Sequence, residues 1–528
     1  MPTASRAEDQ TRQHAATLFG HPKGLYILFL TEMWERFSFY GVRTLLVFFL
    51  TQRFLLSDRH AFAIYGSYGA LVYIYPVLGG MLADRYFGYR RAVAYGAVLM
   101  IIGHAGLVAQ ETFFAASGAH AAFGGALPLS RQLFYLSLAV IIGGVGLLKS
   151  NISTIVGTLY PRESQQRDSG FTLFNCGINI GATLAAFSCG YLGQAWGWAY
   201  GFGLSGAGMV LGLIIFIGGK KYLIVSSDCV ADRSKTALGL RERLVPAVVV
   251  LLSILLTWQL LPRVEYLGYL VVGALVFALG RTFYIGFTEL GLTERQRLWC
   301  ALIIWAIWCS YAILVEQTGS SINLFNDRMV NLYITVPKIV GGSGAIEIRA
   351  SQLLGVSGAL LLLLSPAFAW LWEYLDRRGR NPSTPVKVCL SLCAMSAGYA
   401  IVAAGTLWPD GTGHVRLVWV IGMYLFFALA DLLIVPIGLS AMTRLAAGRA
   451  VGFMVGFWMM GAALGAFVAG RLAQFSSLSR VATAARPVQE ILAHYQRFFG
   501  TFALAALVLA MGFGLLTPLM KKWMHGLK

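Results

Sequence analysis

Charged residues are scarce in this chain. Of its 528 residues, 12% are charged and 57% are hydrophobic, whereas a soluble domain usually carries about 25% charged residues. A chain with so little polar cover cannot meet water over its whole surface. This excludes a soluble enzyme, a nucleic-acid binder and a disordered protein, and leaves lipid as the solvent. The apolar stretches are long and not alternating, so they favour helices over a membrane barrel.

Signatures of catalysis and metal binding are also missing. The seven cysteines form no CxxC pair and no metal-spaced set with histidine, and neither GxSxG nor HExxH occurs. An intramembrane enzyme would need a nucleophile–base pair or metal ligands within its spans, and His104 has no second intramembrane histidine to work with. We therefore expect a protein that is not an enzyme and needs neither cofactor nor metal. His104 is interpreted as a core histidine with its hydrogen bonds satisfied.

What the chain has in abundance is apolar segments that can cross a bilayer, which takes about 20 residues. Fourteen are found, at residues 24–51, 61–83, 92–110, 132–158, 170–190, 197–218, 244–261, 266–287, 297–324, 351–374, 386–407, 416–443, 451–471 and 498–520.

The distribution of basic residues predicts the topology. An even number of spans places both termini on one side, and the loops on that side hold 26 of the 41 lysines and arginines. Because cytoplasmic loops are the basic ones, both termini are expected to be cytoplasmic. The net charge of +18 is therefore interpreted as a topology signal and not as a nucleic-acid surface. Residues 1–20 have no apolar h-region, so we expect no cleaved signal peptide and a multi-pass protein of a bacterial inner membrane.

Long polar connections divide the series of spans into domains. We predict a cytoplasmic segment, a six-helix lobe, a basic linker, an inserted helix pair, a second six-helix lobe and a cytoplasmic tail. Their ranges are 1–23, 24–218, 219–243, 244–287, 297–520 and 521–528. The outer loop 325–350 ends in Gly341, Gly342 and Gly344. This arrangement is typical of the two-lobed secondary transporters that work by alternating access.

Charges inside the first span are the main functional signal. Glu32, Arg36, Tyr40 and Arg43 recur at helical spacing, and Glu35 adjoins them. Charges at this depth cost a few kcal/mol each, so each needs a partner or a function. One interpretation is a structural ladder of ion pairs. The other is the wall of a proton-responsive cleft, in which burial favours the neutral acid and a nearby arginine favours the carboxylate.

The same stretch carries a resemblance to a known family. EMWERFSFYG (32–41) resembles the E-x-x-E-R-F-x-Y-Y-G motif of the proton-dependent oligopeptide transporters, a branch of the major facilitator superfamily. Further segments are similar in the same order along nearly the whole chain. They are GGMLADRYFGYRR (79–91), GLLKSNISTIVGTLY (146–160), GFTLFNCGINIGA (170–182), EQTGSSINLF (316–325), SPAFAWLW (365–372) and DLLIVPIGLSAMTRLA (431–446).

The resemblance implies an all-α polytopic membrane protein with the major facilitator superfamily fold, of two six-helix lobes plus two extra helices. It implies a symporter that couples protons to the import of di- and tripeptides. The expected partners are therefore peptides, protons and the lipid bilayer, with no nucleic acid, and we expect the monomer to be functional. The alternative is a proton-coupled carrier of another small solute, such as a peptide-like drug, an amino acid or an anion. A substrate-sensing receptor on the same scaffold is a further alternative.

The resemblance also implies roles for individual residues. Proton coupling is assigned to Glu32, Glu35, Arg36 and Glu316, and gating to Arg43 with Glu316 and to Asp84 with Arg85. Substrate contacts are assigned to Arg36, Tyr40, Arg43, Tyr73, Lys149, Asn179, Asp431 and Trp458. Lys149 would pair with Glu32 or with the peptide carboxylate, and Asp431 would hold the peptide amino group. Which glutamate carries the transported proton stays open.

Several positions depart from the family pattern around the expected cleft. Asp431 stands where the family usually has glutamate, and Phe39 where it has the first tyrosine of a pair. The other departures are Ser150, Asn175, Ala312, Ser357 and Gly358. We expect proton coupling to be kept, while substrate preference differs.

Overall fold

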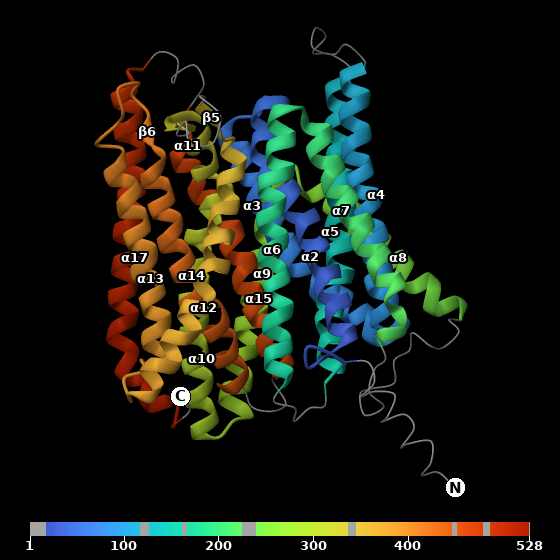
Figure 1. Cartoon of the computed structure of the whole chain (residues 1–528). Helices are drawn as coiled ribbons and strands as arrows, with labels where there is room; N and C mark the ends of the chain where they lie inside the picture. The colour runs from blue at the N-terminus through green and yellow to red at the C-terminus, as the bar shows by residue number, and fades with distance from the viewer. Residues whose placement is uncertain are drawn as a thin grey trace. The chain divides into compact units, whose positions relative to one another are not determined.

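Helices make up nearly all of the described chain (Figure 1). The computed structural model describes residues 17–116, 126–160, 166–223, 239–335, 345–445, 451–478 and 486–526. The helices are α2 (Lys23–Phe48), α3 (Asp58–Leu82), α4 (Tyr89–Ala116), α5 (Ala126–Thr158), α6 (Gln166–Ala195), α7 (Trp198–Gly218), α8 (Leu240–Leu260), α9 (Val264–Thr288), α10 (Leu292–Val315), α11 (Ser321–Met329), α12 (Leu353–Arg377), α13 (Thr384–Gly405), α14 (Leu417–Leu445), α15 (Val451–Leu472) and α17 (Val488–Trp523). Short helical turns are η1 (Phe49–Arg53), η2 (Ala83–Phe87), η3 (Lys220–Tyr222), η5 (Glu316–Gly319), η7 (Ala350–Gln352) and η8 (Ala473–Ser476).

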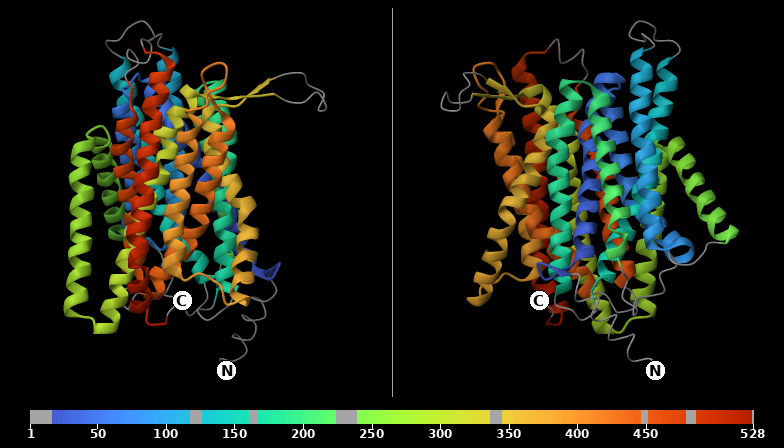
Figure 2. Two further views of the ribbon diagram at one scale, coloured as in Figure 1. Left: turned by 90° about the vertical axis from the view of Figure 1, so that its left-hand side faces the viewer. Right: turned by 45° about the vertical axis from the view of Figure 1, so that its right-hand side comes forward.

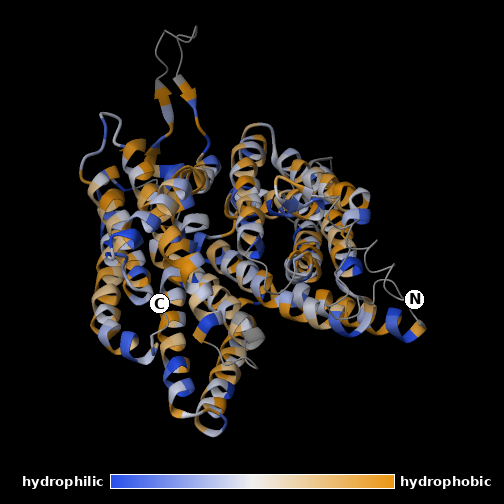
Figure 3. Ribbon diagram, turned by 60° about the horizontal axis from the view of Figure 1, so that its bottom comes forward, coloured by the Kyte–Doolittle hydropathy of each residue, from blue (hydrophilic) through white to orange (hydrophobic). Residues whose placement is uncertain are grey.

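The helices have the length and composition of membrane spans. Within the described residues, 13 helical stretches are long and apolar enough to cross a membrane. The charged helix α2 adds a further span, because its 26 residues reach about 39 Å against a hydrocarbon thickness of about 30 Å. Hydrophobic residues run along the helices, as Figure 3 shows. The predicted all-α polytopic fold is confirmed.

The ninth predicted span is not one continuous helix. Helix α10 ends at Val315, η5 follows, and α11 begins after Ser320, whose φ of −123° and ψ of −97° are not helical. Gly319 lies so close to α3 that a Cβ there would overlap the phenol oxygen of Tyr65. The residues at the break, EQTGSS (316–321), are polar or small, although the predicted span 297–324 runs across them. As a result, Glu316 lies at a helix end and not in mid-helix.

The contacts divide the chain into two compact units. Unit 1 comprises Met1–Val42 and Tyr75–Gln259, and unit 2 comprises Arg43–Ile74 and Leu260–Lys528. The chain passes from one unit to the other inside α2 and again inside α3. The predicted division into two six-helix lobes and an inserted pair stays a prediction.

Glycines set the packing of unit 1. A Cβ on Gly79 of α3 would overlap the carbonyl oxygen of Gly146 in α5, and one on Gly96 of α4 would lie 2.6 Å from the carbonyl oxygen of Gly144. Small residues at such points let membrane helices approach closely. Gly79, the first residue of the segment 79–91, therefore has a packing role.

Aromatic rings fill the core of unit 2. The ring of Tyr399 in α13 lies 5.1 Å from that of Phe427 in α14 and 6.3 Å from that of Phe499 in α17, measured between centroids. All three side chains are fully buried. Rings at these spacings add to the packing energy of the three helices.

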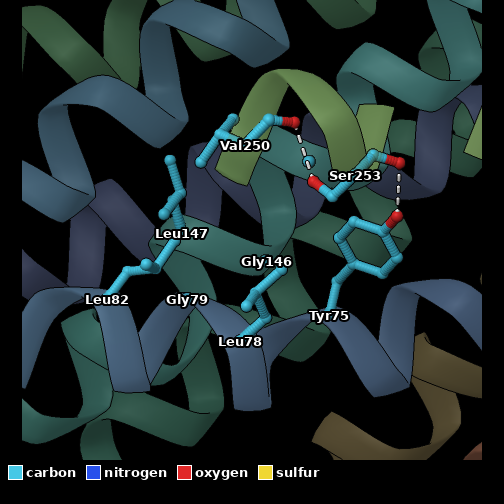
Figure 4. A pocket seen from close by; sticks show the side chains of 9 residues that line it. Tyr75, Leu78, Gly79, Leu82, Gly146, Leu147, Val250 and Ser253 are labelled. Atoms are coloured by element: carbon cyan, nitrogen blue, oxygen red, sulfur yellow. Dashed lines mark hydrogen bonds between the residues drawn. The ribbon is translucent and has the colours of Figure 1, made fainter. Parts of the chain in front are cut away.

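The inserted pair α8 and α9 is shared between the units. In unit 1, Trp258 of α8 donates its indole N–H to the carbonyl of Gln132 at 3.1 Å, and Tyr75 of α3 donates to the carbonyl of Ser253 at 2.7 Å. A small pocket lies beside this contact, between α3, α5 and α8 (Figure 4). In unit 2, Arg471 of α15 donates to the carbonyl of Val264 at the start of α9.

The described strands are short. Strand β1 (Thr17–Leu18) pairs antiparallel with β2 (His21–Pro22), and β3 (Val330–Asn331) pairs parallel with β6 (Val415–Arg416). Strand β4 (Tyr333–Thr335) pairs antiparallel with β5 (Ala345–Glu347) in a hairpin that projects from the helices of unit 2 (Figure 2). These last two strands lie in the predicted loop 325–350, whose three glycines fall outside the described residues.

Candidate functional site

Four charged side chains are paired in the interior of unit 1. Arg36 donates through Nη2 to Oε1 of Glu35 at 2.5 Å and through Nε to the other carboxylate oxygen. Lys149 of α5 forms an ion pair with Oε1 of Glu32. The same oxygen lies 3.7 Å from Nε of Arg36. Both glutamates are fully buried. The two positive and two negative charges offset each other, which is the condition for keeping them at this depth.

The second oxygen of Glu32 is incompletely satisfied. Among the described residues, Oε2 of Glu32 is buried and has no hydrogen-bond partner. A buried acceptor without a partner costs about 1–3 kcal/mol. Protonation of Glu32, or arrival of a donor, would relieve this cost. A proton on Glu32, or a ligand that donates to it, can therefore change the Lys149–Glu32 pair.

Phe39, one of the departures from the family pattern, takes part in this charged cluster through its ring. The guanidinium carbon of Arg36 lies 4.7 Å from the centroid of the Phe39 ring, a cation–π contact. The Phe39 ring meets Tyr40 edge-on at 5.2 Å. Phe39 therefore lacks the hydroxyl of the family's tyrosine, but its ring still contacts Arg36. The neighbouring Tyr40 keeps its phenol.

His104 is a core histidine, as the sequence predicts. It is 1% exposed, Nδ1 lies 2.7 Å from the Met100 carbonyl oxygen, and Nε2 lies 3.1 Å from the Ser38 hydroxyl. Both ring nitrogens therefore have partners.

A second buried ion pair lies in unit 2, at the break between α10 and α11. Arg43 donates through Nη2 to Oε2 of Glu316 at 2.6 Å, and through Nε to the phenol oxygen of Tyr65 at 2.7 Å. The side chains of all three residues are buried. The resemblance implies the Arg43–Glu316 pair but not Tyr65, which sequence reasoning missed. The gating role of the pair stays a prediction.

Further polar contacts hold the end of α2 and the start of α3 within unit 2. Asp58 receives two hydrogen bonds from Arg328 of α11, at 2.7 and 2.8 Å. Gln52 donates to Asp327 at 3.0 Å, and Thr44 donates to the carbonyl of Ser351 at 2.6 Å. The partners are some 270 residues or more apart in sequence, so no local sequence pattern predicts these contacts. A two-pronged arginine–carboxylate pair is the geometry that holds two chain segments most firmly.

Asp431 of α14 is held by a tyrosine. The phenol of Tyr311 in α10 donates to Oδ1 of Asp431 at 2.5 Å. The ring of Trp308 stacks on that of Trp458 at 4.3 Å and on that of Tyr311 at 5.7 Å. Trp458, a predicted substrate contact, is 3% exposed, so in this structure it mainly packs against Trp308. Tyr311 and Trp308 carry no motif of their own and were not predicted.

The remaining predicted residues have weaker structural support. Tyr73 of α3 and Asn179 of α6 are half-buried, and Asn179 reaches the carbonyl of Asn175 at 3.5 Å. Asp84 and Arg85 lie exposed in the turn η2. Their roles stay predictions.

The predicted substrate residues are divided between the two units. Unit 1 holds Arg36, Tyr40, Lys149 and Asn179, and unit 2 holds Arg43, Tyr73, Asp431 and Trp458.

Comparison with known proteins identifies the family. Residues 90–489 match the family described as PTR2, POT family. The uncharacterized transporter YclF of Bacillus subtilis is 32% identical over 96% of this chain and 96% of its own length. The peptide transporter YePEPT of Yersinia enterocolitica is 33% identical over 86% of this chain and 88% of its own. A crystal structure of a peptide transporter POT in complex with sulfate superposes with a TM-score of 0.77 and 29% identity, covering 98% of this chain and 99% of that one.

Spans that keep paired charges at membrane depth, in a fold shared with transporter structures, define a secondary transporter of the major facilitator superfamily. Within that class the chain belongs to the POT family.

Proposed function

We propose that the protein is a symporter that uses a proton gradient to import di- and tripeptides by alternating access. The observation that carries this proposal is the pairing of buried acids with buried bases, Glu32 with Lys149 and Glu35 with Arg36. In a family of oligopeptide transporters, such pairs couple a proton to a ligand. A proton on the acid frees the base, and the free base attracts a carboxylate.

Protonation would act on two places. On Glu35 or Glu32 it would release Arg36 or Lys149 for the carboxylate of a peptide. On Glu316 it would weaken the pair with Arg43 and so loosen the outer end of the helices. Protonation of these glutamates would then enable the protein both to bind peptide and to open.

The amino group of the peptide would bind Asp431. A substrate whose ammonium binds Asp431 more tightly in one conformation than in another would favour that conformation. A ligand shifts a conformational equilibrium only through such differential affinity.

The departures from the family pattern favour a second candidate, a proton-coupled carrier of another small solute. Ser150 lies in the continuous helix α5, where the family usually has a proline. Asn175 is exposed on α6. Asn175 changes the polar surface that a ligand would meet, while the acid–base pairs remain.

The setting of the protein is part of the proposal. We place it as a multi-pass protein of a bacterial inner membrane with both termini in the cytoplasm, since the loops on that side are the basic ones. We propose that the monomer is functional and that the proton is the only coupling ion.

Uptake of labelled dialanine into proteoliposomes tests the proposal. The outside is made acidic, and uptake is measured with and without a protonophore. Accumulation that the protonophore abolishes supports proton–peptide symport. Exchange of another solute in the same vesicles, without any dialanine uptake, would overturn it in favour of the second candidate.

A further inference from the structure

The hydrogen bond between Tyr311 and Asp431 has a defined geometry. Among the described residues, the Tyr311 phenol, at 2.5 Å from Oδ1, supplies the one hydrogen bond that the Asp431 carboxylate receives. Asp431 is half-buried, whereas Tyr311 is 1% exposed. A buried donor thus holds one edge of a carboxylate that remains partly accessible.

The Tyr311 ring has little freedom to move. It stacks on Trp308 with an interplanar angle of 20°, and Trp308 stacks on Trp458 at 12°. Trp308 in turn donates its indole N–H to the carbonyl of Trp458 at 3.0 Å. This links α10 to α15 through a stack of three rings. The phenol that reaches Asp431 is therefore positioned by two tryptophans.

Glycines of α15 make room for this stack. A Cβ on Gly461 would lie 2.6 Å from Cδ1 of Trp308, and one on Gly465 would overlap the Cβ of Ala312. At position 312 the two helices are thus too close for an indole, which some family members have there. Trp308, one helical turn earlier, supplies the indole in this chain.

We propose that Tyr311 is a positioning residue for substrate recognition, which fixes the Asp431 carboxylate so that its second oxygen receives the ammonium of the substrate. This rests on the proposed function, because it takes a peptide amino group as the ligand of Asp431. Aspartate is one methylene shorter than the usual glutamate, so its reach depends more on its orientation. A carboxylate held in place loses less conformational freedom when the ammonium binds. The ligand class is therefore a small molecule with a free primary amine.

The test is the affinity of purified Tyr311→Phe for dialanine and for N-acetyldialanine, measured by calorimetry beside the wild type. Because the ligand loses part of the benefit of a charge-assisted hydrogen bond to Asp431, we expect roughly a tenfold weaker dialanine affinity. Binding of N-acetyldialanine, which has no ammonium, should change less than twofold. Equal weakening for both ligands would overturn the proposal, since that is the result of a merely structural role.

A matched control is Tyr399→Phe. Tyr399 is buried in the same unit and donates to the carbonyl of Leu314 at 2.6 Å. It also loses one buried phenol hydrogen bond, but no ligand group depends on it. Dialanine affinity should be kept within twofold. A loss as large as that of Tyr311→Phe would contradict the positioning role.

A double-mutant cycle separates this inference from the proposed function. If Tyr311 acts through Asp431, adding Tyr311→Phe to Asp431→Asn should weaken dialanine binding no further. Additive losses would overturn the positioning role alone. Wild-type protein that binds no dialanine would overturn both the proposed function and this inference. If Asp431→Asn weakens dialanine binding and Tyr311→Phe does not, only this inference falls.

Discussion

Replacing Glu316 with glutamine should loosen the packing of the helices around Arg43. The change imitates protonation without altering the size of the side chain. Glutamine keeps an acceptor for Nη2 of Arg43, now 2.6 Å from a carboxylate oxygen, and Arg43 keeps its bond to Tyr65. What is lost is the charge. Since charge-assisted hydrogen bonds are about twice as strong as neutral ones, the loss is about 1–1.5 kcal/mol, or roughly tenfold in the equilibrium between the paired and the separated side chains.

A buried reporter cysteine near the pair measures this opening. Ala350 is 1% exposed, and the next residue, Ser351, receives the hydrogen bond from Thr44. We expect Ala350→Cys to react slowly with a membrane-impermeant maleimide and roughly tenfold faster when Glu316→Gln is added. Leu55→Cys, at an exposed position of the connection between α2 and α3, provides the fully accessible control. Protein without an added cysteine provides the background from the native thiols.

Two outcomes would refute the reasoning about Glu316. If labelling of Ala350→Cys is equally slow with and without Glu316→Gln, the ion pair does not hold the helices around Arg43 together. If Glu316→Gln speeds labelling of Leu55→Cys as much as that of Ala350→Cys, the substitution has disturbed the whole region.

Three further predictions concern other contacts. Asp58→Asn should weaken the two-pronged bond to Arg328 and destabilise the detergent-solubilised protein by about 1–3 kcal/mol, measured as a lower apparent Tm. Glu35→Gln should impair gradient-driven uptake more than counterflow exchange, because exchange at equal pH needs no net proton transfer. In the loop between α13 and α14, the hydrogen bond from the Thr412 hydroxyl holds the pKa of Asp410 well below its usual range. The ionised Asp410 therefore contributes its full stabilisation above the pKa of the unfolded state, which is about 4. This contribution is lost as the pH falls from there through the lower pKa of the folded state. Thus the apparent Tm of Asp410→Asn should lie below that of the wild type at pH 7 and approach it below pH 4.

Each of these predictions has a contradicting result. For Asp58, the exchanged pair Asp58→Arg with Arg328→Asp should recover part of the lost Tm, and no recovery would argue against a direct pair. Equal loss of uptake and exchange in Glu35→Gln would remove Glu35 from proton coupling. A Tm difference for Asp410→Asn that is as large well below pH 4 as it is at pH 7 would mean that the ionised carboxylate is not what stabilises the loop.

The sequence predicts the spans of this fold well because each depends on a local property. A run of about 20 apolar residues is visible without any tertiary information. Helix ends are predicted less well: α17 begins at Val488, ten residues before the apolar run that marks it. Polar residues near the bilayer surface continue a helix that hydropathy alone would end. The break after Val315 falls at the polar or small residues 316–321, where Gly319 packs against Tyr65, a residue far away in sequence.

For the candidate site, the sequence points to the charged residues but not to their uncharged partners. Glu32, Glu35 and Lys149 stand out because a charge in an apolar span is rare. Tyr65 and Tyr311 do not, because a tyrosine in a span is common and its hydrogen bond depends on tertiary packing. Ion pairs such as Asp58 with Arg328 look like ordinary loop charges in the sequence.

The inserted helices α8 and α9 have a mechanical consequence. Helix α8 is bonded to unit 1 through Trp258, and the first residue of α9 is bonded to unit 2 through Arg471. Between Leu260 and Val264 the chain has only four Cα–Cα links, which extend to about 14 Å at most. Any transport cycle that keeps both attachments must therefore move the two anchoring surfaces apart by less than this reach. A larger separation of these surfaces would have to unwind a turn of α8 or α9 or break one of the two hydrogen bonds.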